Sequence, residues 1–192
     1  MTENAADQGG AVRGDGAGAG STPESTKRPE PWLRGSLGDL PVMTRAVLHA
    51  LELAGEDVER WCAGLTDEQL NARPAGVAPV AFHLRHMVRS ADRLLTYAND
   101  RELSAEQTAA LKTELEAGAT REELFEEFRA GIESAAARVR AFTPAQFEEP
   151  RKVGRLRLPT TVGSLLIHVA EHTQRHAGQA VTTAKIVAGS RK

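Results

Sequence analysis

Five of the six histidines in the chain fall into two clusters with helical spacing. His83 and His86 are three residues apart, and His168, His172 and His176 recur at every fourth position. Imidazole nitrogens are good ligands for Zn²⁺ and Ni²⁺. Residues four apart on a helix lie one above the other, about 6 Å apart at their Cβ atoms, so two such rings can converge on one ion. The pattern therefore predicts a metal site that draws ligands from two helices.

The second cluster can supply only two ligands to one ion. His168 and His176 lie about 12 Å apart along a helix axis, too far for bonds of about 2 Å to one metal. A helical wheel places His172 and His176 nearest the apolar residues of their segment, so they form the predicted pair. For the first cluster the wheel favours His83 over His86. Each cluster alone is better explained by polar residues on a helix flank, and only the two together favour a metal site.

Two other side chains with potential chemistry stand apart from these clusters. His49 is isolated on an earlier segment, and we predict that it makes a local hydrogen bond. Cys62 is the only cysteine, which rules out an internal disulfide and any CxxC site. It follows Trp61 near the end of an apolar stripe, so we predict a buried spectator thiol rather than a nucleophile.

Four long amphipathic segments must position the histidines. Apolar residues at intervals of three and four predict helices over about residues 41–65, 79–98, 120–142 and 160–187. Capping signals predict one short turn after Thr66 and a modest helix over 105–116, which Ser104 begins. Residues 143–160 contain three prolines and form a long connection, in which a weak apolar alternation allows a small hairpin. We predict an all-α, up-down four-helix bundle.

The first 38 residues differ in composition from the rest of the chain. They hold eight of the seventeen glycines and few large apolar side chains, so they cannot bury enough surface to offset the entropy of ordering. We predict a disordered tail over residues 1–38, with Trp32 and Leu33 resting on the domain, and one domain over residues 39–190.

Charge and hydropathy narrow the classes of partner. The formal net charge is −2, which gives no general reason to expect nucleic acid or an anionic membrane as partner. The chain shows no secretory-type segment and no run of the roughly 18 apolar residues that a membrane span needs. We therefore predict a soluble, cytoplasmic protein without nucleic-acid or membrane partners.

The two histidine clusters, taken with their neighbours, resemble the DinB-like superfamily of metal-binding four-helix bundles. The resemblance extends over about residues 40–188 and rests on the runs 83–97 and 168–179. In that family one ligand comes from a His-apolar-x-x-Ser run, and two come from a final His-x-x-x-His before a Gly-Gln or similar pair. The resemblance implies His86, His172 and His176 as metal ligands. It leaves His83 and Gln179 as candidate catalytic groups, and does not settle whether His83 or His168 also contacts the ion.

The resemblance also implies a range of functions. Three histidines leave coordination positions open, as in catalytic zinc or nickel sites. Characterised relatives include transferases and isomerases that use low-molecular-weight thiols such as mycothiol or bacillithiol, acting on a small-molecule substrate. The alternatives are a metal-dependent hydrolase and a non-catalytic metal-binding stress-response bundle. For a hydrolase, Glu171 is a poor general base because it points about 100° away from His172. Because dimers are common in the family, a homodimer is one assembly to test.

Overall fold

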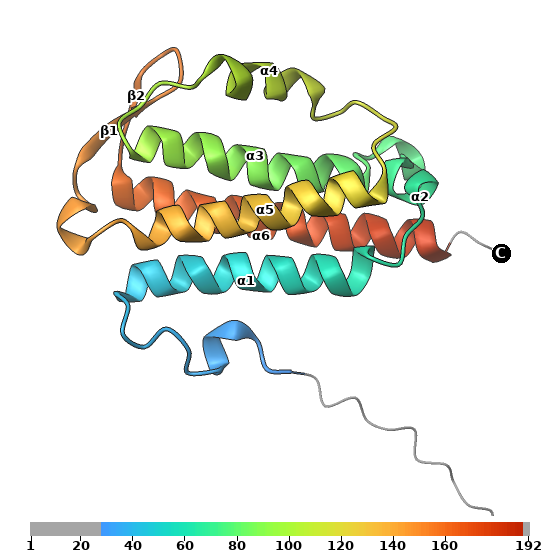
Figure 1. Ribbon diagram of the computed structural model, residues 1–192, viewed down its shortest axis with the longest axis horizontal. Coiled ribbons are helices and arrows are strands. Elements are labelled where there is room, and N and C mark those ends of the chain that lie inside the picture. Colours follow the sequence, from blue (N-terminus) through green and yellow to red (C-terminus); the bar gives the residue numbers. More distant parts are fainter. Residues whose placement is uncertain (1–27, 190–192) are drawn as a thin grey trace, which may run out of the picture.

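The predicted all-α bundle is confirmed by a computed structural model, which describes residues 28–189. Four long helices lie side by side along the molecule (Figure 1). They are α1 (Val42–Cys62), α3 (Val80–Ala98), α5 (Arg121–Arg140) and α6 (Val162–Gly189). Helix α6 packs between α1 and α3, and α5 packs on α3 and α1. The interface between α3 and α6, which carry the two histidine clusters, is among the most extensive in the bundle.

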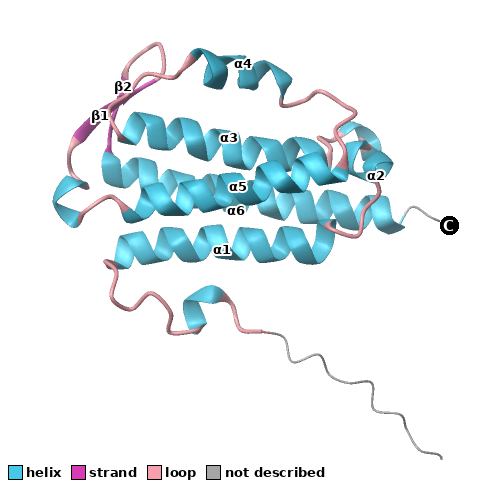
Figure 2. Ribbon diagram, in the orientation of Figure 1, coloured by secondary structure: helices cyan, strands magenta, loops and turns pink. Residues whose placement is uncertain are grey.

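Shorter elements connect these helices at both ends of the bundle (Figure 2). Helix α2 (Asp67–Asn71) lies between α1 and α3, and α4 (Ala105–Thr113) lies between α3 and α5. Strands β1 (Pro150–Val153) and β2 (Leu158–Thr161) form the antiparallel hairpin that the apolar alternation allowed. Capping boxes begin α2 at Thr66, α4 at Ser104 and α5 at Thr120, so the local capping chemistry determines where these helices start.

The helix directions run up, down, down, up and so differ from the alternation of the predicted up-down bundle, because α4 returns the chain along the outside of α3 (Figure 1). Helices α3 and α5 therefore run the same way. Arg138 near the end of α5 pairs with Asp92 in the second half of α3, while Glu127 in the first half of α5 pairs with Arg89. Helix α4 buries none of its own residues and is held to α3 by polar contacts, such as those of Gln107 with Asp92 and Thr96.

The core consists of aliphatic and aromatic residues from all four long helices, among them Leu51, Leu84, Leu95, Phe128 and Leu166. Helices α3 and α5 pack closely at Gly131, where an added Cβ atom would overlap the side chain of Val88. Among the described helices, none combines the length and the apolar character needed to span a membrane.

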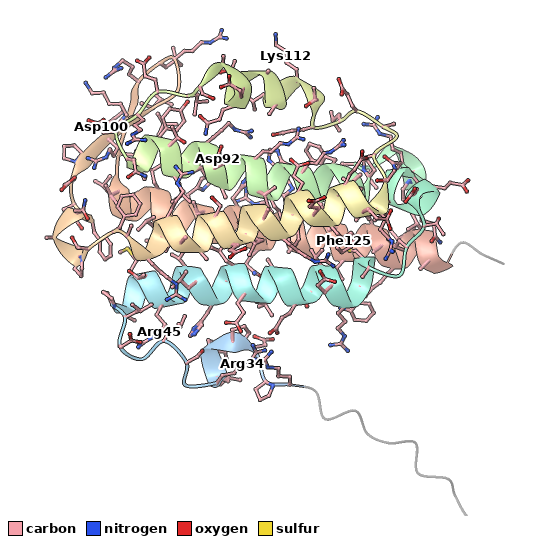
Figure 3. All side chains as sticks on the ribbon, in the orientation of Figure 1. Arg34, Arg45, Asp92, Asp100, Lys112 and Phe125 are labelled. Atoms are coloured by element: carbon pink, nitrogen blue, oxygen red, sulfur yellow. The ribbon has the colours of Figure 1, made fainter. Side chains whose placement is uncertain are left out.

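Part of the predicted tail contacts the bundle. Residues Pro31–Leu33 form a short 3-10 helix whose Pro31 is buried against the rest of the protein. Arg34 makes ion pairs with Glu52 and Glu56 on α1, below which it lies in Figure 3. Trp32 is 64% exposed, so Pro31 and Arg34 rather than Trp32 anchor this segment. Residues 1–27 of the predicted tail lie outside the described part of the chain.

Candidate metal centre

The rings of His86, His172 and His176 converge in the interface between α3 and α6. One nitrogen from each ring lies within 4.8 Å of the other two. The Nε2 atoms of His86 and His172 are 2.8 Å apart, and the His176 ring centroid lies 4.5 Å from each of the other two. The structure thus brings together the three histidines that the sequence singled out as ligands, in an arrangement that could hold one metal ion.

The ring of His86 is oriented by Glu114, the C-cap residue directly after α4. The Nδ1 atom of His86 lies 2.7 Å from Oε2 of Glu114, and Arg93 donates from Nη1 to Oε1 of the same carboxylate at 2.8 Å. Glu114 is only 5% exposed. Burial raises the pKa of this carboxyl, but the hydrogen bonds from His86 and Arg93 and the charge of Arg93 outweigh that effect and lower it. The ionised carboxylate therefore accepts a hydrogen bond from the Nδ1–H group and leaves the Nε2 lone pair of His86 for a metal.

His83 orients His176 in a similar way. Their Nδ1 atoms are 3.0 Å apart, so one must donate and the other accept. If the His176 proton lies on Nδ1, its Nε2 lone pair is available to a metal and His83 accepts through Nδ1. The wheel correctly predicted that His83 faces the core, since it is 5% exposed. Its place beside His176, however, makes it a partner of a candidate ligand rather than a member of the converging set.

Three rings of this cluster, the buried His83 and the half-buried His172 and His176, are neutral near pH 7. Burial, followed by the charge of neighbouring His86, lowers the pKa of His83 and His172 to about 4. Burial and the adjacent histidines lower the pKa of His176 to about 3. A neutral imidazole is the form that binds a metal, so His172 and His176 can bind a divalent ion such as Zn²⁺ or Ni²⁺ without first losing a proton.

The other predicted candidates occupy the rim of the site. His168 lies outside the converging set, with its Nδ1 atom 3.6 Å from the exposed carboxylate of Glu171. Glu171 therefore faces His168 on the surface, and it supplies no general base to the centre. Gln179 is exposed and lines a cavity together with His83.

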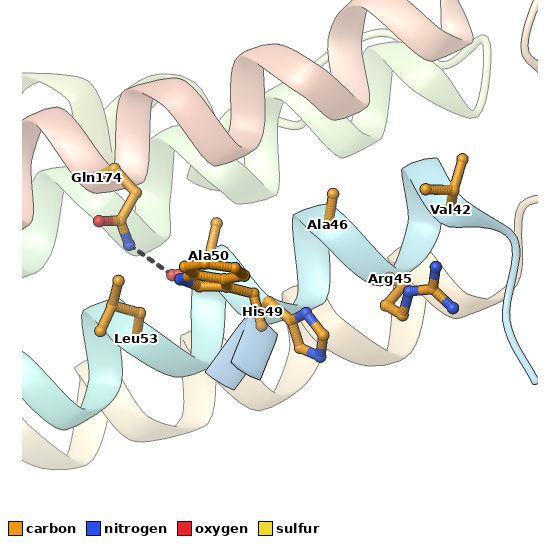
Figure 4. A pocket seen from close by; sticks show the side chains of 8 residues that line it. Val42, Arg45, Ala46, His49, Ala50, Leu53 and Gln174 are labelled. Carbon is orange, nitrogen blue, oxygen red and sulfur yellow. Dashed lines mark hydrogen bonds between the residues drawn. The ribbon is translucent and has the colours of Figure 1, made fainter. Parts of the chain in front are cut away.

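Gln174, between the two α6 ligands, fixes α6 against α1. Its Nε2 atom donates to the backbone oxygen of Ala50 at 2.7 Å, at one side of a cavity lined by Trp32, His49 and Leu53 (Figure 4). This contact points the opposite face of α6, which carries His172 and His176, toward α3. His49 makes the local hydrogen bond that the sequence predicts, with its Nε2 atom 3.2 Å from the hydroxyl oxygen of Ser36.

Cys62 is a spectator thiol, as its position in the sequence predicts. It is fully buried in the core, and burial with the nearby charge of Asp57 raises its pKa to about 12. A thiol in this state is not a nucleophile at neutral pH.

Sequence analysis did not identify Glu114 and Arg93. One signal was available: Arg93 follows His86 by seven residues, two helical turns, and so shares its face. A cation on a ligand-bearing face needs an acidic partner when it is buried. No local pattern could select Glu114 as that partner, because it lies 28 residues from His86 on a separate helix.

The fold and the converging histidines define a class of protein, the helical bundle with a three-histidine cluster between two of its helices. The comparisons with known proteins supply the family. The profile of the DinB superfamily matches residues 50–180, and the chain belongs to that superfamily. A crystal structure described as a conserved protein from Enterococcus faecalis is similar in fold, with a TM-score of 0.62 and 22% sequence identity over 79% of this chain and 99% of the other. No curated protein matches the sequence.

Proposed function

We propose that the protein binds one Zn²⁺ or Ni²⁺ ion through His86, His172 and His176 and is a transferase that uses a low-molecular-weight thiol of the mycothiol or bacillithiol type. The observation that supports this most directly is the convergence of the three ring nitrogens within 4.8 Å. Three protein ligands leave coordination positions open, which is typical of catalytic rather than structural sites. A bound divalent ion would lower the pKa of a thiol that enters an open position, so that the thiol is nucleophilic at neutral pH.

The residues around the cluster have separable roles in this proposal. Glu114 and His83 hold the Nδ1 atoms of His86 and His176 and so direct the opposite nitrogens toward the same point. Because Cys62 is buried and protonated, the reactive sulfur must come from a bound thiol. Such thiols are kept reduced in the cytoplasm, which is where we place the protein.

A hydrolase fits the centre less well. Activation of water needs a general base beside the site. Glu171 lies on the surface next to His168, and both oxygens of Glu114 are already engaged by His86 and Arg93. Neither carboxylate is placed to take a proton from a water molecule, so we favour thiol chemistry.

Cobalt substitution tests the thiol directly. The protein loaded with Co²⁺ is titrated with cysteine, mycothiol and bacillithiol while its absorption spectrum is recorded. We expect a sulfur-to-metal charge-transfer band with at least one thiol, since an open position admits a sulfur ligand. A spectrum that no thiol changes would contradict the transferase proposal while leaving the metal site intact.

Replacing one ligand separates a catalytic centre from a structural one. His176→Ala leaves two imidazoles, too few to hold zinc well, whereas the apolar faces of four helices still specify the bundle. We expect circular dichroism to show the same helical content, metal content to fall steeply, and any thiol-transfer activity to be lost. His168→Ala, on the same helix but outside the cluster, is the matched control and should keep its metal. Unfolding of the His176→Ala protein would identify a structural metal, and stoichiometric metal in it would refute the ligand assignment.

A further inference from the structure

A cavity of about 430 Å³ opens beside His83, on the side of the cluster toward the C-terminal end of α6. Its apolar surface comes from Val77 and Ala78, which precede α3, and from Ile186 near the end of α6. Val77 and Ile186 are both about half exposed, so this surface is open to an incoming ligand. A volume of this size is within the usual range for small-molecule sites.

Two polar atoms on largely buried residues line this cavity without a partner among residues 28–189. Thr183 is 4% exposed, and its hydroxyl makes no hydrogen bond to any residue in 28–189. His83 is equally buried, and its Nε2 atom has no partner in the same residues. Neither atom is among the fully buried unpaired ones, which are Thr44 Oγ1 and Arg85 Nε, so both are accessible to water or a ligand in the cavity.

The charge of the cavity is positive. Arg175 lies in the lining and forms no ion pair with a carboxylate in the described part of the chain, and no Asp or Glu lines the cavity. When His176 donates from Nδ1, His83 carries its own proton on Nε2 and is a hydrogen-bond donor. An arginine, an imidazole N–H and a hydroxyl around an apolar surface suit an anion with an apolar body, and they offer nothing to balance the charge of a cation.

We propose that this cavity binds a small carboxylate with an apolar body, with Arg175 pairing with the carboxylate and Thr183 and His83 donating to it. The cavity adjoins the metal centre, because His83, in its wall, lies 3.0 Å from the candidate ligand His176. In the proposed function this carboxylate belongs to the second substrate, the acceptor of the thiol. The inference rests on the proposed function for that role only, since binding of the carboxylate requires no thiol.

The test is a binding titration with the full-length protein after dialysis against a chelator, so that a carboxylate cannot bind a metal ion instead. The probes are hexanoate, 1-hexanol and hexylammonium, which share a six-carbon chain and differ in charge, and acetate, which lacks the chain. We expect hexanoate to bind with a dissociation constant of about 1 mM, and the other three to bind more weakly. In ¹H–¹⁵N spectra, hexanoate should shift the amide signals of Gly178, Thr182 and Thr183.

Matched variants localise the binding. Arg175→Gln removes the cation, and we expect hexanoate to bind about tenfold more weakly. Thr183→Val keeps the shape of the side chain and removes the hydroxyl, and should weaken binding about threefold to tenfold. The controls are Arg155→Gln, an exposed arginine in the hairpin turn, and Thr44→Val, which removes a hydroxyl that is buried and unpaired on α1. Both should bind within twofold of the parent protein.

Each contrary result has a distinct meaning. Unchanged binding in both Arg175→Gln and Thr183→Val would place hexanoate elsewhere and overturn the inference. If hexanol bound as tightly as hexanoate, charge would have no role in binding, and the inference would be overturned as well. If no probe binds the chelator-treated protein, but the cobalt protein still gives a band with thiols, the cavity assignment fails and the proposed function stands. If hexanoate binds but no thiol gives a charge-transfer band, the assignment of the cavity stands and the transferase proposal is refuted.

Discussion

Two ligand rings of the candidate centre are fixed through their Nδ1 atoms, but by partners of different charge. His86 faces the carboxylate of Glu114, whereas His176 faces the neutral ring of His83. A carboxylate raises the basicity of the ring to which it bonds, and a neutral acceptor does so less. Arg93 balances the charge of Glu114, so the buried carboxylate remains ionised. His86 should therefore be the strongest donor of the three.

The first prediction concerns Glu114. Glu114→Gln keeps the size of the side chain but removes the charge that holds His86 and Arg93 together. Loss of such a partner typically weakens metal binding 10- to 100-fold, and we expect a loss within about that range for Zn²⁺, measured by competition with a chromophoric chelator. Glu116→Gln, an exposed acid two residues away, is the control and should bind as the parent does. Equal affinities in the two variants would refute a positioning role for Glu114.

The sequence identified the candidate ligands by two different routes. Helical geometry alone selected His172 and His176, because both lie next to the apolar stripe of one long helix. Geometry preferred His83 to His86, and the family resemblance was needed to select His86. The reason is now visible: His83 is the more buried ring but contacts His176, while the partly exposed His86 meets both α6 rings. Burial and convergence are separate properties, and a helical wheel reports only burial.

At the scale of elements, the amphipathic stripes and capping boxes predicted which segments are helical and where several begin. They did not determine helix direction, and α5 departs from the predicted up-down alternation, because a hydrophobic pattern is the same whichever way a helix runs. The direction of α5 depends on α4, which has no buried residue and therefore carries no apolar signal of its own. That weakly patterned helix brings its C-cap residue Glu114 to His86, so this member of the site could not be predicted from the sequence.

The second prediction concerns the contact between α3 and α5. Gly131→Ala places a methyl group against Val88, two residues after His86, so α3 and α5 must move apart. Overpacking of this kind costs about 1–3 kcal/mol, which we expect to lower the melting temperature by several degrees in a calorimetric scan. The same substitution at Gly55, where an added Cβ atom meets nothing within 4 Å, should instead stabilise α1 by about 0.5–1 kcal/mol. Equal changes in stability at the two sites would mean that the close packing at Gly131 does not exclude a methyl group.

At the scale of the whole molecule, the cluster ties folding stability to pH. In the unfolded chain a histidine titrates with a pKa near 6.5. In the folded protein the pKa of His83 and of His172 is about 4 and that of His176 about 3, chiefly because of burial. Below about pH 6.5 the unfolded chain therefore takes up protons that the folded protein does not. The stability of the metal-free protein should be full above that pH and should decline as pH falls toward 4.

The last prediction is the number of protons that the protein takes up when it unfolds in mild acid. Between pH 7 and pH 5 most carboxylates remain ionised, so the three histidines with lowered pKa dominate the difference, and unfolding at pH 5 should take up about three protons. Urea titrations of the metal-free protein at several pH values give this number from the slope of the unfolding free energy. The double variant His172→Asn/His176→Asn should reduce the uptake to about one proton, that of His83. If parent and double variant show the same slope, the cluster is protonated in the folded state, and the neutral donor set on which the metal centre depends is wrong.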